Sequence, residues 1–157
     1  MTIVARLGRL NAFAERATAP LASLFLLATR LYVSWQFIKS GLLKLQDWDT
    51  TLVLFQEEYH VPLLPPALAA VAGTAGELLF PALLVLGLGT RYAALGLSAV
   101  NVMAVVSYAH VLLAEGSEAA LGQHVLWGYL LLVVLVFGPG AFSADRAAGS
   151  SGSGGRR

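Results

Sequence analysis

The sequence predicts an all-α integral membrane protein: a four-helix bundle with a short interfacial amphipathic helix between the first and second spans. Of its 157 residues, 57% are hydrophobic and only 12% are charged, whereas a soluble domain is about 25% charged. A soluble fold of this length exposes much of its surface and could not hide so many apolar side chains. Four apolar stretches are long enough to cross a bilayer as helices.

These stretches are separated by polar segments or by turns. In order, the expected spans are about residues 20–45, 66–88, 92–113 and 122–137. The first is the least apolar because it contains Arg30, Lys39 and Lys44, and the third contains no Asp, Glu, Lys or Arg. In the first connection, over residues 50–59, the apolar side chains fall on one face of a helix and the acidic side chains on the other. This pattern predicts the interfacial amphipathic helix.

Polar segments flank the membrane region on both sides. We divide the chain into an N-terminal cytoplasmic segment (residues 1–19), a four-helix domain (20–140) and a cytoplasmic tail (141–157). The tail is rich in Gly and Ser from residue 147, a composition typical of disordered linkers.

The distribution of positive charge predicts the orientation in the membrane. Arginines lie in the N-terminal segment, the second loop and the tail, whereas carboxylates lie in the first and third loops. Because loops rich in Lys and Arg stay in the cytoplasm, we expect a multi-pass protein of the bacterial inner membrane with both termini in the cytoplasm. The lipid bilayer is then its first partner.

Charge and cysteine content exclude several classes of function. The net charge is +1, which provides no basic field to attract nucleic acid. The chain has no cysteine, so thiolate catalysis and cysteine-bound iron–sulfur clusters are excluded. A redox role would need a bound cofactor, a metal on His or carboxylate, or a partner protein.

A small set of polar side chains is expected in the bilayer interior. From the helical rise, Arg30, Glu77 and Asn101 lie at similar depth in spans one, two and three. Ser34 and Ser98 share the faces of Arg30 and Asn101. Two interpretations stay open: a structural Arg30–Glu77 ion pair completed by Asn101, or a proton-conducting or ligand-binding site.

All three histidines fall on the predicted outer side. His60 lies in the first loop, His110 near the end of span three and His124 at the start of span four, with Glu57 one helical turn before His60. Imidazole and carboxylate ligands suit copper, zinc or another divalent metal. The alternative is that these histidines cap helix ends or face water.

The lysines of span one lie toward the same outer side. Lys39 and Lys44 are candidates for binding an anionic ligand, and Lys44 is also placed to pair with an acidic residue of the first loop. The alternative is that Lys44 extends to the membrane interface, as long cationic side chains commonly do.

Three stretches resemble the DoxX family of small four-helix membrane proteins. The first is Arg30 followed by Gly41–Leu45, the second runs from Gly76 to Ala94, and the third is Gly138–Ser143. The resemblance covers about residues 20–146 and implies an inner-membrane protein of four helices. Carried over position by position, the family-like polar residues are Arg30, Lys44, Glu77 and Arg91.

The resemblance implies a range of activities. Some members are similar to subunits of quinone-linked oxidoreductases, others to membrane partners of redox or detoxification enzymes. A further branch resembles proteins encoded beside the maturation machinery of copper-binding peptides, and residues 48–52 and 59–66 look most similar to that branch.

Three functions compete on these grounds. The first is an accessory subunit that docks or assists a partner protein or peptide in a redox- or metal-stress system. The second is a quinone-reactive oxidoreductase subunit, in which Glu77 handles protons and Arg30 or Lys44 stabilises a quinone oxygen. The third is a small transporter or export factor. The sequence contains no phosphate-binding loop, nucleophile elbow or HExxH motif, so no catalytic residue is assigned. Candidate cofactors are a quinone or copper, and a homo-oligomer is a candidate assembly.

Overall fold

The computed structural model describes residues 3–152, and every regular element in that range is a helix. In chain order these are α1 (Ile3–Gln46), α2 (Trp48–Glu57), α3 (Pro66–Leu86), α4 (Thr90–Ser107), α5 (Ala109–Leu112), α6 (Glu118–Phe137) and α7 (Ala144–Gly152). The predicted all-α class is confirmed. Three of these helices are long and apolar enough to cross a membrane: α1 from Leu7, α3 and α6.

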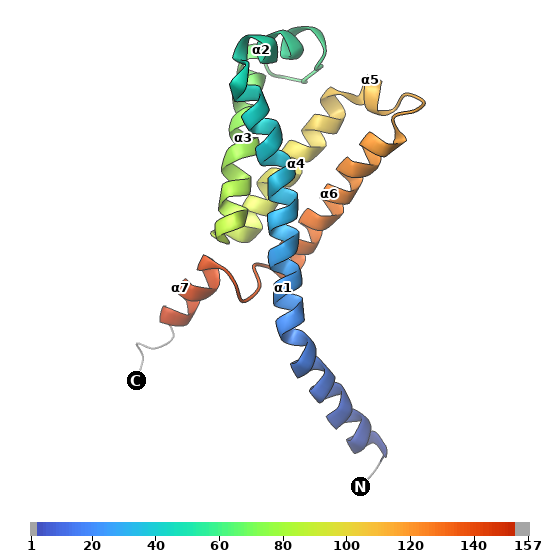
Figure 1. Cartoon of the computed structure of the whole chain (residues 1–157), viewed down its shortest axis with the longest axis vertical. Coiled ribbons are helices and arrows are strands. Elements are labelled where there is room, and N and C mark those ends of the chain that lie inside the picture. The colour runs from blue at the N-terminus through green and yellow to red at the C-terminus, as the bar shows by residue number, and fades with distance from the viewer. Residues whose placement is uncertain (1–2, 153–157) are drawn as a thin grey trace.

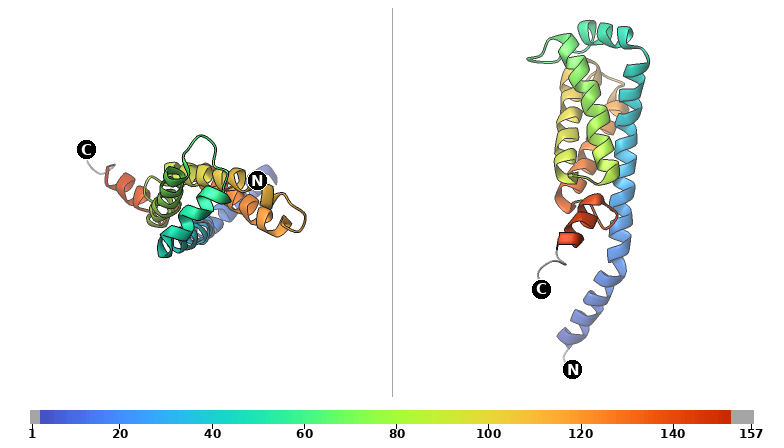
Figure 2. Two further views of the ribbon diagram at one scale, coloured as in Figure 1. Left: turned by 90° about the horizontal axis from the view of Figure 1, so that it is seen from above. Right: turned by 90° about the vertical axis from the view of Figure 1, so that its left-hand side faces the viewer.

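The four long helices pack in a ring. Helix α1 contacts α3 and α6, and α4 also contacts α3 and α6. Figure 1 shows that α1 and α6 cross near the end of α6 and diverge toward the end that carries α2 and α5. In Figure 2, α2 lies across that end, whereas α7 and the N-terminal part of α1 lie at the opposite end.

Helix α1 is longer than the span predicted from the sequence. It continues through Pro20, so the expected boundary between residues 1–19 and 20–140 falls inside a helix. A proline in a helix interior removes one hydrogen bond and bends the helix. Figure 1 shows the N-terminal part of α1 inclined to the rest of the helix, beyond the other three long helices.

The helix expected in the first connection is confirmed as α2, which begins at Trp48. Asp47 caps it: one carboxylate oxygen accepts a hydrogen bond from the Thr50 backbone N–H at 3.0 Å, and the other from the Thr50 hydroxyl at 2.7 Å. These two bonds hold the pKa of Asp47 below its ordinary value. Helix α2 buries Thr51 and Phe55, and Phe55 packs against α3.

The third apolar stretch is broken where the sequence predicts a continuous helix over 92–113. Helix α4 ends at Ser107 and the short α5 follows. The Ser107 carbonyl accepts a hydrogen bond from the His60 backbone N–H at 2.9 Å, while the Val111 N–H donates to the Tyr108 carbonyl at 3.1 Å. A loop distant in sequence therefore takes the acceptor that Val111 would use in an unbroken helix.

The tail also differs from the prediction of disorder from residue 147. Helix α7 extends from Ala144 to Gly152, and residues 153–157 lie outside the described part of the chain. Its start is fixed because the Asp145 backbone N–H donates to the Gly87 carbonyl at 2.9 Å, and the Ser143 hydroxyl accepts from the Arg146 N–H at 3.2 Å. Contacts with the α3–α4 turn thus order a segment whose composition alone suggests a linker.

The Asp145 side chain completes this contact. Its carboxylate accepts hydrogen bonds from the Gly89 N–H at 2.7 Å and from the Thr90 N–H and hydroxyl at 2.9 and 2.8 Å. It therefore caps the N-terminus of α4. Burial opposes ionisation of Asp145, but these bonds and the Arg30 charge outweigh it and hold the pKa of Asp145 below its ordinary value.

Candidate functional site

Glu77 pairs with Lys44 on the neighbouring helix. The Lys44 Nζ lies 2.8 and 2.7 Å from the two carboxylate oxygens of Glu77 and 2.8 Å from the Ser40 hydroxyl oxygen. The two charged side chains are only 16% and 11% exposed. Gly41 allows this approach of α1 and α3, because a Cβ there would lie 2.8 Å from Leu78.

The predicted Arg30–Glu77 ion pair is therefore wrong. Arg30 is completely buried and donates a hydrogen bond to the Phe142 carbonyl at the opposite end of the bundle. Lys44 follows Arg30 by fourteen residues, about 21 Å along α1. The predicted depths were wrong because α1 and α3 pack in a different register: Gly41 lies against Glu77 and Leu78, whereas Arg30 lies beside Gly87 at the end of α3.

The remaining members of the predicted layer are also dispersed. Ser34 is fully buried, and its hydroxyl has no hydrogen-bond partner among the described residues. The Ser98 hydroxyl donates to the Ala94 carbonyl of its own helix at 2.8 Å. Asn101 contacts neither Arg30 nor Glu77 through a hydrogen bond; instead it binds His124 of α6.

The structure does not assemble the four candidate metal ligands. His60 and His110 are exposed and stack edge to face with ring centroids 4.8 Å apart, whereas His124 lies against Trp127, and Glu57 ends α2. In residues 3–152 no group of three or more His, Cys, Asp or Glu is placed to hold a metal ion.

The two other candidate ligand-binding cations lie apart from the Lys44–Glu77 pair. Lys39 is exposed on α1. Arg91 donates a hydrogen bond to the Val136 carbonyl at 3.3 Å and lies beside Gly138, at the end of α6.

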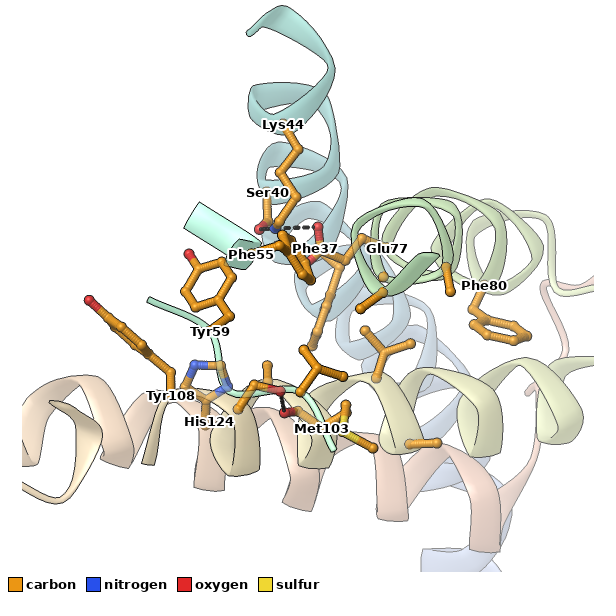
Figure 3. Close-up of a pocket in the computed structure, with 18 of the residues that line it drawn as sticks. Phe37, Ser40, Lys44, Phe55, Tyr59, Glu77, Phe80, Met103, Tyr108 and His124 are labelled. Atoms are coloured by element: carbon orange, nitrogen blue, oxygen red, sulfur yellow. Dashed lines mark hydrogen bonds and ion pairs between the residues drawn. The ribbon is translucent and has the colours of Figure 1, made fainter. Parts of the chain in front are cut away.

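A cavity of about 520 Å³ opens between the diverging helices. Figure 3 shows Lys44, Ser40 and Glu77 on one wall and His124 on the opposite wall, with Tyr59 and Tyr108 at one side. The rest of the lining is mainly apolar. It includes Phe37, Phe55, Phe80, Val100, Met103, Leu112 and Trp127.

The model of the DoxX family matches residues 25–110, more than half of the chain. The chain belongs to the DoxX family. The matched region contains all four polar positions that carried the resemblance: Arg30, Lys44, Glu77 and Arg91. Among curated proteins and solved structures, no match to this chain was found.

Within this DoxX protein the four polar positions divide into two groups. Lys44 and Glu77 line the cavity, whereas Arg30 and Arg91 fix the carbonyls of Phe142 and Val136 at the other end. An apolar cavity with a few convergent polar groups is typical of small-molecule sites. Ionisable side chains inside a membrane protein are costly and usually functional.

Sequence reasoning missed the aromatic side of the DoxX cavity. Tyr59 stacks edge to face on Tyr108, with ring centroids 5.2 Å apart, and both line the cavity. Burial raises the pKa of Tyr59 above its ordinary value, and the proximity of Tyr108 and Glu77 adds to the effect. Neither tyrosine was among the predicted site residues, because Tyr59 follows α2 and Tyr108 follows α4 and only the fold brings the two rings together.

Proposed function

We propose that this DoxX protein is a membrane subunit that binds a quinone-type ligand in the cavity and acts with a partner protein that exchanges the electrons. The observation that carries the proposal is the Lys44–Glu77 ion pair in the wall of a mainly apolar cavity. A lipid-soluble ring with a polar oxygen matches both properties of this lining.

Each polar side chain of this wall has a defined role in the proposal. The three N–H bonds of Lys44 are directed at Ser40 and Glu77, which leaves the Ser40 hydroxyl to donate to a ligand oxygen. Conversion of a quinone to a quinol takes two electrons, which the partner would supply, and two protons. Glu77 is placed to relay both protons in turn, each taken up from water, and Lys44 to compensate the charge that Glu77 gains or loses.

The membrane arrangement in this proposal has four spans. Helix α4 packs between α3 and α6, which supports it as the fourth span beside α1, α3 and α6. The distribution of Lys and Arg supports an inner-membrane orientation with both termini in the cytoplasm. The cavity would then lie in the outer half of the bilayer.

A role beside a partner protein is supported by the loop between α2 and α3. Leu63 is fully exposed there and has a φ of 69°, a left-handed conformation that is costly for a residue with a Cβ. The adjacent Leu64 lines the cavity. We expect Leu63→Asp to weaken the partner contact without changing ligand affinity, a combination that misfolding would not produce.

Calorimetric titration of the purified full chain in lipid nanodiscs with decylubiquinone tests the proposal. The wild type should bind saturably after subtraction of the heat from empty nanodiscs. Ser40→Ala should weaken binding about threefold, since it removes the hydrogen bond to the ligand. Lys44→Met should weaken binding about tenfold, since it leaves the Glu77 charge without compensation in the wall that faces the ligand. Lys39→Met is the matched control on an exposed position of the same helix and should bind like the wild type.

Two results would contradict the proposal. One is the absence of saturable binding by the folded wild type, which would favour an accessory or export role without a quinone. The other is equal binding by the Lys44→Met and Lys39→Met variants.

A further inference from the structure

The wall opposite Lys44 carries a second polar group that the proposed function does not use. His124 lines the cavity from α6 (Figure 3). Its Nδ1 lies 2.9 Å from the Asn101 Oδ1, and the Asn101 Nδ2 donates to the His124 carbonyl at 2.9 Å. Asn101 is almost completely buried, so one side chain of α4 holds His124 at both its ring and its backbone carbonyl.

These two bonds determine the protonation pattern of the ring. A backbone carbonyl only accepts, so the Asn101 group bonded to it is the NH₂. The Asn101 oxygen therefore faces the His124 Nδ1, which must carry the proton. In the neutral ring, Nε2 is left as an acceptor with its lone pair free for a ligand.

An unused donor lies beside this acceptor. The Trp127 ring contacts the His124 ring edge to face, with centroids 4.9 Å apart, and also lines the cavity. The Trp127 Nε1 is buried, and no residue in the described part of the chain accepts its hydrogen bond. A buried N–H without an acceptor is destabilising, and a ligand oxygen in the cavity would supply the missing acceptor.

We infer that His124 and Trp127 form a second polar end of the cavity, which binds the second oxygen of a ring carrying oxygens at opposite positions. Asn101 is a positioning residue that sets the tautomer of His124. This inference rests on the proposed function and narrows it: the ligand class is a 1,4-quinone or its quinol, bound through both oxygens, in preference to a lipid with a single polar group.

A matched pair of ligands distinguishes the contributions of the two polar ends to binding. 2-Decylhydroquinone and 2-decylphenol have the same ring and tail and differ only in the second hydroxyl. In the nanodisc calorimetry, the wild type should bind the hydroquinone about tenfold more tightly. His124→Phe should reduce this preference to about twofold or less, while His110→Phe, at an exposed histidine outside the cavity lining, should retain it.

Trp127→Phe keeps an aromatic ring but removes the indole N–H together with the second ring, so it provides a further test if His124→Phe does not fold. It should weaken binding of decylubiquinone, whose oxygens only accept, about fivefold. Equal wild-type affinity for the two ring ligands would overturn the second polar end. If decylubiquinone still binds in a Lys44-dependent manner, the proposed function survives that result. Absence of all binding would overturn both.

The role of Asn101 has its own readout. Nitrogen-15 spectra of histidine-labelled protein should show the Nδ1–H tautomer for His124, assigned by loss of its signals in His124→Phe. Asn101→Leu should remove this tautomer preference and the preference for the hydroquinone, whereas Asn101→Asp, which still accepts from Nδ1–H, should restore the tautomer. An Nε2–H tautomer in the wild type would contradict the assignment.

Discussion

Lys44 and Glu77 form an ion pair between α1 and α3, in which the Lys44 Nζ lies 2.8 and 2.7 Å from the two carboxylate oxygens of Glu77. Both charges are largely removed from solvent. In such pairs the loss of one partner is more damaging than the loss of both, because a single buried charge remains without compensation.

We therefore predict that Lys44→Met or Glu77→Met alone lowers the free energy of unfolding by about 3 kcal/mol. The double variant should recover most of that loss, because it leaves no unpaired charge in the cavity wall. Unfolding of the detergent-solubilised variants, followed by tryptophan fluorescence, provides the measurement. Losses that simply add in the double variant would show that the pair is not energetically coupled.

The second prediction concerns the acid stability of the α7 contact. The folded pKa of Asp145 lies below its ordinary value, so its contribution to stability is present above about pH 4. That contribution is lost as the pH falls through the lower, folded pKa. The protection factors of the Gly89 and Thr90 amides, which correct for the intrinsic pH dependence of hydrogen exchange, should fall over this range in the wild type.

Asp145→Asn should lower these protection factors at neutral pH and remove their acid dependence. Asp49→Asn, in the exposed first turn of α2, is the matched control and should leave the profile unchanged. An unaltered profile in Asp145→Asn would contradict the assigned role.

The third prediction compares two glycines of the α3–α4 turn. Gly87 and Gly89 have φ values of 68° and 54°, where a residue with a Cβ costs about 1–2 kcal/mol. A Cβ at Gly87 would also collide with Arg30 and lie 2.5 Å from the Ser143 Cβ, whereas one at Gly89 meets nothing within 4 Å.

Gly87→Ala should therefore lower the melting temperature clearly more than Gly89→Ala, since only the former displaces Arg30. Differential scanning fluorimetry of the two variants suffices for the comparison. Equal effects would mean that the turn conformation, and not the contact with Arg30, limits substitution.

The fourth prediction tests the proposed topology. Alkaline phosphatase fused after Arg146 should be inactive, because the enzyme folds only in the periplasm, and a fusion in the loop after Leu113 should be active. Green fluorescent protein at the same two positions should give the reciprocal pattern. Activity of phosphatase after Arg146 would contradict cytoplasmic termini.

Much of the fold could be predicted because it follows from local patterns. The long apolar stretches give the helices, and the amphipathic spacing before Pro62 gives α2. The break after Ser107 could not be predicted, because a hydrogen bond from His60, 47 residues earlier in the chain, produces it. The order in residues 147–152 similarly depends on contacts of the preceding residues with a turn that is distant in sequence.

The candidate site was only partly predictable. Glu77, Asn101 and Lys44 were chosen as candidate site residues because polar and charged side chains are costly inside a bilayer. All three make interhelical hydrogen bonds. Their partners were assigned wrongly, because depth estimates assume that adjacent spans begin at one level. In the observed register Gly41, and not Arg30, lies against Glu77, and Lys44 is the partner of Glu77.

The bonds from Arg30 and Asp145 fasten the bundle at one end, while α1 and α6 separate toward the other. The two ends of the molecule therefore differ in how firmly the helices are held together. Near the cavity the Asn101–His124 bonds hold α6 to α4, so these two helices form one unit there. Any change in the width of the cavity must then come from separation of α1 and α3 from that unit, with the fastened end left intact.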